Sequence, residues 1–166
     1  GTSWLLAGGK ESSAAIQELT QWQQSVSSPL TGLIWTSESI DRKSVSGIAY
    51  RLPGNILSPY NLLTENNGAD LFSRSLDWGA AWQGFDLPSR ITLQNSAVVF
   101  ISTACKQTCA SLVRYGDFEI LIPAENDPLA TASWLEGLGA SPEIILLPGE
   151  ETIDALWLND TAPAAV

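Results

Sequence analysis

The chain has 166 residues, of which 45% are hydrophobic and 16% are charged, so it can bury a core and is too poor in charge for a disordered polyelectrolyte. Its net charge is −10, and no basic residue follows Arg114. This balance argues against strong nucleic-acid binding, because phosphate contacts need clustered Lys and Arg. No apolar run approaches the ~20 residues of a membrane span, so we expect no membrane insertion of this piece.

The first third of the chain predicts a strand, a helix and a second strand. Residues 4–7 are apolar and precede a Gly-Gly turn, and the serines at 12 and 13 can cap the helix that follows. Residues 30–36 form a second apolar run. The helix presents one apolar stripe at three- and four-residue spacing, formed by Ile16, Leu19, Trp22 and Val26.

The middle is less regular, and strand periodicity returns after it. Turn signals lie at 53–55 and 66–68, with a short helix expected at 69–77 and a connection through Trp78 and Trp82. These two tryptophans could stack a ligand, although tryptophan in such a segment more often covers a core edge. From residue 85, alternating segments predict an antiparallel meander, at 91–93, 97–102, 110–114 and 118–122.

A helix is expected next, because Asn126 and Asp127 lead into Pro128 at a favoured first helical position, and Gly139 ends it. We expect a strand at 143–147, a helix at 150–158 and the start of a strand at 163–166. Together these elements indicate one layered α/β domain over residues 1–166. The apolar face expected for the 128–138 helix comprises Leu129, Ala132, Leu135 and Leu138.

Histidine and methionine are both absent. Without histidine the chain cannot form a histidine triad, a Cys-His dyad or a histidine zinc site. Serine catalysis is not favoured, because no G-x-S-x-G or S-x-x-K motif surrounds Ser37, Ser39 or Ser44. Because the chain lacks an initiator methionine and begins almost within an apolar segment, we expect it to be excised from a longer protein.

Several motifs then occur in a recognisable order. Residues 5–9 (LLAGG) occupy the place of an L-I-D-x-G strand and turn, and residues 33–36 lead to 36–42 (TSESIDR), where a T-H-x-D/H-x-D-H metal motif is expected. Further along, residues 108–118 (TCASLVRYGDF) match N-x-x-S-L-V-x-x-x-Y-G. Residues 121–125 (LIPAE) fall on L-L-T-G-D, and residues 147–152 (LPGEET) fall on V-P-H-H-G-S.

This order resembles the metallo-β-lactamase fold, and within it the extracytoplasmic domain of ComEC-like DNA-uptake (competence) proteins. The resemblance implies an αββα sandwich whose first strands precede Gly1, in a piece of a larger membrane protein. It places seven residues at vestigial active-site positions, where only the aspartate of the first motif is retained and where Glu125 replaces a metal-bridging aspartate. These positions are Ser37, Ser39, Asp41, Arg42, Glu125, Gly149 and Glu150.

What the resemblance implies for function follows from metal chemistry. Zinc needs three or more converging nitrogen, sulfur or carboxylate ligands, which serine, arginine and glycine do not supply. We therefore expect a catalytically inactive domain without a cofactor, acting as a structural or interaction module. The family implies a place on the extracytoplasmic face of the cell membrane, with other domains of the parent protein as its partners.

Other interpretations stay open. An enzyme could use a rebuilt Mg²⁺ or Ca²⁺ site of Asp41, Glu125 and Glu150, or the same carboxylates could act in pairs in glycoside hydrolysis. The old cleft could also bind a small ligand. Because three carboxylates without a cation repel one another, we expect Arg42, or failing it Lys43, within salt-bridge reach of Glu125 or Glu150.

The two cysteines form a separate candidate. Cys105 and Cys109 flank three residues between two predicted strands, so a tight hairpin would bring their α-carbons to the ~5.5–6 Å that a disulfide prefers. An extracytoplasmic setting would oxidise them. The alternative is a pair of free buried thiols.

Overall fold

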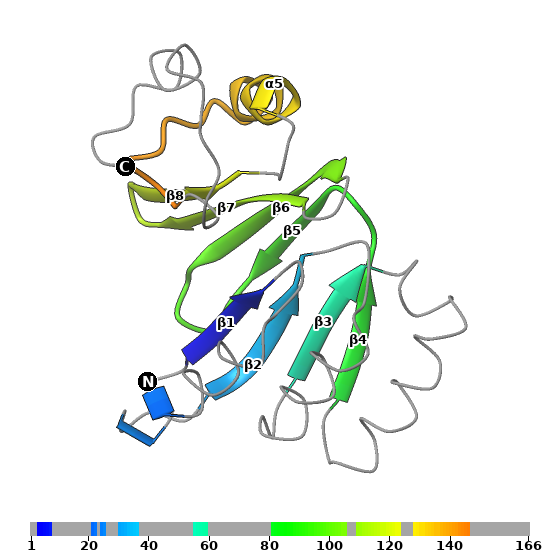
Figure 1. Cartoon of the computed structure of the whole chain (residues 1–166), viewed down its shortest axis with the longest axis vertical. Helices are drawn as coiled ribbons and strands as arrows, with labels where there is room; N and C mark the ends of the chain where they lie inside the picture. The colour runs from blue at the N-terminus through cyan, green and yellow to red at the C-terminus, as the bar shows by residue number, and fades with distance from the viewer. Residues whose placement is uncertain are drawn as a thin grey trace. The chain divides into compact units, whose positions relative to one another are not determined.

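A computed structural model describes residues 3–7, 21–22, 24–25, 30–36, 55–59, 81–105, 109–123 and 128–146 (Figure 1). The chain divides into two compact units, Gly1–Asp86 and Leu87–Val166. The helices expected at 69–77 and 150–158, the strand expected at 163–166 and most of the helix expected at 12–26 lie outside the described residues. The expectation of a single domain stays a prediction, because this division does not say whether either unit folds alone.

The first unit contains a parallel sheet of four strands in the order β1 to β4. The strands expected near residues 4–7 and 30–36 are confirmed as β1 (Ser3–Ala7) and β2 (Leu30–Trp35). The irregular middle that we expected is wrong at β3 (Asn55–Pro59) and β4 (Ala81–Phe85), which are both strands. Their sequences, NILSP and AWQGF, lack the alternation on which strand prediction depends.

A glycine makes the pairing of β1 with β2 possible. Trp4 is the register partner of Gly32, and its ring lies where a side chain at position 32 would project. A β-carbon at position 32 would also fall 2.7 Å from the carbonyl oxygen of Asn55 on β3. Only a residue without a side chain fits between the indole and the neighbouring strand.

The tryptophans of this unit differ in their environments. Trp82 is buried in β4, and its indole N–H donates a 2.6 Å hydrogen bond to the hydroxyl of Ser58 on β3. It is a core residue within a strand, so the expected connection is wrong at this position. Trp22, which we expected on the buried stripe of the first helix, is 43% exposed.

The second unit contains the predicted antiparallel meander. It consists of β5 (Ser89–Thr92), β6 (Val98–Cys105), β7 (Cys109–Tyr115) and β8 (Phe118–Ile122). The turn between β7 and β8 has two residues, and the first, Gly116, has a φ of 62°. This is the turn type that places glycine first and matches the twist of the strands. The strand expected at 143–147 is confirmed as the shorter β9 (Ile144–Ile145), which pairs parallel to β8.

One helix, α5 (Pro128–Leu138), covers one face of this sheet (Figure 1). Its predicted start at Pro128 and its end before Gly139 are confirmed. Leu135 packs with Leu112, Leu121 and Ile145 in a buried cluster, joined by partly buried side chains from the helix and β6. We call this side of the sheet the helix-covered face.

The expected apolar face of α5 is wrong at Leu129, which is 79% exposed. Steps of three residues turn a helix by about 300°, so four residues spaced by three spread over about half of its circumference. The first of them therefore leaves the face that Leu135 and Leu138 share. Thr131, which is fully buried and four residues before Leu135, takes the inward position instead.

The C-terminus of α5 is closed by hydrogen bonds that require a left-handed residue. The N–H of Gly139 donates to the carbonyl of Glu136, and the N–H of Ala140 donates to the carbonyl of Leu135, both at 3.0 Å. This pair of bonds is the Schellman motif, and Gly139 supplies its left-handed residue with a φ of 60°.

We expect Gly139→Ala to lower the free energy of unfolding by about 1 kcal/mol, because a β-carbon disfavours the left-handed conformation. The matched control is Gly137→Ala, where a β-carbon meets no atom within 4 Å and the backbone is helical. That change should instead raise stability by about 0.5–1 kcal/mol. Urea unfolding followed by circular dichroism checks both, and equal effects of the two changes would contradict the assignment of the cap.

Candidate functional site

The residues that the sequence places at the vestigial active site lie outside the described part of the chain. This holds for Lys43 and for all seven positions, Ser37, Ser39, Asp41, Arg42, Glu125, Gly149 and Glu150. The ion pair expected between Arg42 or Lys43 and Glu125 or Glu150 therefore stays a prediction. Among the described residues, no group of three or more His, Cys, Asp or Glu side chains could hold a metal ion.

The strands that precede two of these positions are described, and they end at the same edge of the second sheet. β8 and β9 are parallel neighbours, with Leu121 opposite Ile145. Glu125 follows the end of β8 by three residues, and Glu150 follows the end of β9 by five. Because the carboxyl ends of parallel neighbours meet at one edge, both glutamates belong to segments that leave the sheet there.

The cysteines belong to the same edge of this sheet. Ser111 pairs with Ile122, so the beginning of the antiparallel strand β7 lies beside the end of β8. Cys109 starts β7, is buried and is disulfide-bonded, and Cys105 is its α-carbon partner across the ladder. The described residues include no free cysteine, and the whole chain contains two. These observations favour the Cys105–Cys109 bridge predicted from the sequence.

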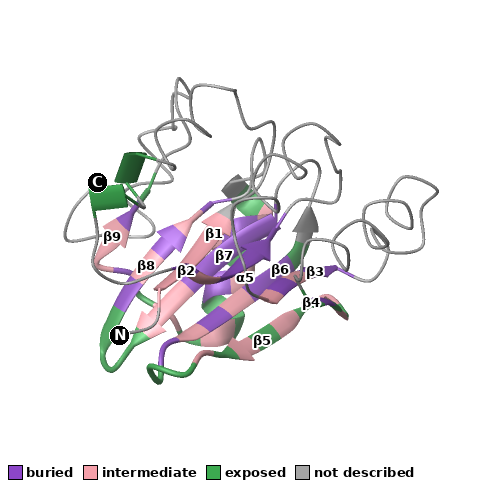
Figure 2. Cartoon of the chain, turned by 90° about the horizontal axis from the view of Figure 1, so that it is seen from below, coloured by how far each residue is buried: buried purple, intermediate pink, exposed green. Residues whose placement is uncertain are grey.

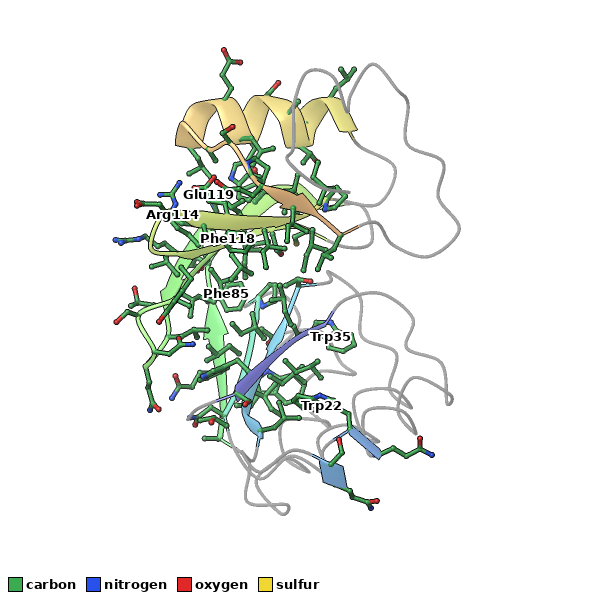
Figure 3. All side chains as sticks on the ribbon, turned by 90° about the vertical axis from the view of Figure 1, so that its left-hand side faces the viewer. Trp22, Trp35, Phe85, Arg114, Phe118 and Glu119 are labelled. Atoms are coloured by element: carbon green, nitrogen blue, oxygen red, sulfur yellow. The ribbon has the colours of Figure 1, made fainter. Side chains whose placement is uncertain are left out.

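A charged cluster on the β7–β8 hairpin was missed from the sequence. Arg114 and Glu119 are opposite each other in the register, and Figure 3 shows them side by side. The Arg114 Nε–H donates to Glu119 Oε1 at 2.6 Å, and Arg114 Nη2 lies 2.5 Å from the same oxygen. Glu119 is buried, with 8% of its surface exposed, so its charge is largely removed from water. Two residues on either side of a two-residue turn signal would have revealed this pairing.

Glu119 also binds the connection that leads from α5 into β9. Its Oε2 accepts a 2.9 Å hydrogen bond from the N–H of Ser141. Its own N–H donates to Oε2 of Glu143 at 2.6 Å, and its carbonyl accepts from the N–H of Glu143 at 3.1 Å. Both carboxylate oxygens are therefore engaged, so this residue holds structure together rather than offering a free base.

Comparisons with known proteins establish the fold. No family profile and no curated protein matches the sequence. Among solved structures, Zn²⁺-bound PqqB from Methylobacterium extorquens aligns with a TM-score of 0.56 and 12% identity, over 88% of this chain and 52% of PqqB. A variant of the CmlA β-hydroxylase aligns with a TM-score of 0.51 and 14% identity, over 83% of this chain and 30% of CmlA.

Both structures have the metallo-β-lactamase fold, so the fold class expected from the sequence, α/β of the metallo-β-lactamase type, is confirmed. The chain spans about half the length of PqqB and less than a third of CmlA. Of the helices in the described residues, none has the length and apolar character to cross a membrane.

The disulfide generates one prediction. Alkylation of the denatured, unreduced protein should add no label, and alkylation after reduction should add one label to each of the two cysteines. Intact mass measurement distinguishes these results, and a Cys109→Ser variant supplies the control, because it should take one label without reductant. Two labels on the unreduced native sequence would contradict the bridge.

The charged cluster generates another. We expect Glu119→Gln to lower the free energy of unfolding by about 1–3 kcal/mol, because the amide cannot accept from both Arg114 and the Ser141 N–H without leaving a buried group unpaired. Glu136→Gln removes the same charge from an exposed position on α5 and should change stability by less than about 0.5 kcal/mol. Urea unfolding compares them, and equal midpoints would contradict the role of Glu119.

Proposed function

We propose that this chain is a catalytically inactive metallo-β-lactamase-fold domain that acts as a structural or interaction module of a ComEC-like DNA-uptake protein. The observation that carries the proposal is the combination of this fold with a sequence that contains no histidine. Imidazole is the commonest ligand in zinc sites with an open catalytic position. At the positions that the resemblance assigns to ligands, the chain carries Ser37, Ser39 and Arg42 instead.

The described acidic residues support an inactive domain. Glu119, the buried one, uses both carboxylate oxygens in bonds to Arg114 and Ser141. Glu143 receives the N–H of Glu119. A general base or a metal ligand needs a lone pair that is free to reach a substrate or a cation, and neither of these contacts provides one for the vestigial site.

The setting is supported by redox chemistry and charge. A disulfide at Cys109 fits an oxidising compartment outside the cytoplasm. A net charge of −10 disfavours strong binding of DNA by this chain, so contacts to DNA would belong to other parts of the protein. The role left to this domain is to contact those parts.

A second candidate is favoured by the geometry of the sheet edge. Because β8 and β9 end side by side, the segments that carry Glu125 and Glu150 leave the sheet together. Carboxylate oxygens at such an edge are suitable ligands for Mg²⁺ or Ca²⁺. With Asp41 they would form the rebuilt site of a metal-dependent hydrolase.

Elemental analysis and a nuclease assay test the proposal. The purified protein should contain far less than one zinc per chain and should cleave neither single- nor double-stranded DNA with Zn²⁺, Mn²⁺ or Mg²⁺ added, because its donor set lacks imidazole. About one tightly bound zinc per chain would overturn it. Mg²⁺-dependent cleavage that Asp41→Ala abolishes, and that the control Asp117→Ala at the exposed β7–β8 turn retains, would establish the second candidate.

The setting is tested separately in cells that carry the full gene. Deletion of the gene should reduce uptake of labelled DNA, and restoration with Asp41→Ala should recover it, because the proposal gives this residue no catalytic role. Undiminished uptake in the deletion strain would contradict the ComEC-like assignment.

A further inference from the structure

Both basic residues in the described part of the chain converge on one aromatic ring. The guanidinium carbon of Arg114 lies 5.1 Å from the centroid of the Phe100 ring, and that of Arg90 lies 5.9 Å from it. Arg90 pairs with Phe100 in the register, and Arg114 pairs with Val98, two residues from Phe100 on the same strand. All of these side chains therefore project from the helix-covered face.

This part of the helix-covered face is open to solvent. The buried cluster beneath α5 involves Leu112 and Leu121, on β7 and β8, whereas Phe100 on β6 is only partly buried. Arg90, on the outer strand β5, is exposed, and the Arg114 side chain is 32% exposed. Figure 2 shows the same gradient, from the largely purple β7 to the pink and green β5. A ligand can reach both guanidinium groups.

The two arginines differ in how their charges are matched. Arg114 gives Nε–H and one Nη to Glu119, which fixes the plane of its guanidinium and leaves its other N–H groups available. Among the described residues, Arg90 has the Phe100 ring as its contact and no carboxylate within ion-pair distance. One held guanidinium and one uncompensated guanidinium thus flank the same ring.

We propose that Arg90 and Arg114 bind a single phosphate group, either free phosphate or a phosphomonoester. Arginine forks match phosphate oxygens in pairs. A tetrahedral phosphate can receive one fork and still offer oxygens to a second fork from another direction, whereas a carboxylate has two oxygens in one plane. A long polyanion is disfavoured, because the chain carries a net charge of −10 around this one cluster.

Titration with sodium phosphate at constant ionic strength tests the site, with the Nε–Hε signals of the arginines followed by NMR. Two signals should shift along one saturable curve. Arg90→Gln should weaken phosphate binding about tenfold, because charged hydrogen bonds are lost, and Arg90→Lys should fall between it and the native protein. Lys10→Gln, which removes one positive charge elsewhere in the sequence, should leave the curve unchanged.

Further ligands separate the sources and the competing explanations. Phosphoserine binding more tightly than inorganic phosphate assigns the site to a phosphomonoester, and the reverse order assigns it to free phosphate. Shifts that never saturate, equal binding in Arg90→Gln, acetate binding as tightly as phosphate, or an oligonucleotide binding more tightly than either would each overturn the proposal. Thermal unfolding of the Arg90 variants confirms that they are folded, so lost binding is not lost structure.

Discussion

The carboxylate and the peptide group of Glu119 join four parts of the second unit. They bind Arg114 on β7, Ser141 in the connection after α5 and Glu143 at the entry to β9. A buried carboxylate is tolerated only where its oxygens are matched by donors, so the arrangement of its partners is strongly constrained. Because Glu143 immediately precedes β9, this network fixes where β9 begins beside β8, and with it the edge at which both strands end.

The fold and the chemistry of this chain point in different directions. The fold is shared with Zn²⁺-bound PqqB, while the sequence offers no imidazole. A scaffold can outlast the chemistry that it once carried, because strand pairing and core packing do not depend on the residues of the loops. In this chain the cross-strand pairs of β6, β7 and β8, the cap of α5 and the Glu119 network are all independent of any metal.

Local signals made part of this structure predictable. Pro128, Gly139 and the turn at Gly116 act over two or three residues, so the bounds of α5 and the β7–β8 hairpin followed from the sequence. The strands β3 and β4 did not, because parallel strands need no alternation and depend on neighbours distant in the sequence.

The candidate site divides in the same way. Its vestigial positions were assigned through an ordered resemblance, and no local pattern places their side chains. Glu119 is acidic and buried, which composition alone argues against, and only its place opposite Arg114 could have identified it. The convergence of Arg90 and Arg114 on Phe100 was equally hidden, because it depends on the register of three strands.

The two sheets also differ in how far apart their pairing partners lie along the chain. Neighbouring strands of the meander are joined by at most about five residues, whereas each pairing in the first sheet spans a crossover of about twenty. Closing a longer loop costs more conformational entropy before any contact compensates for it. The β5–β8 meander can thus gain its contacts early in folding, while the parallel sheet must wait for its crossovers to order. In a chain made from its N-terminus, the part that is synthesised first is therefore the part expected to assemble more slowly.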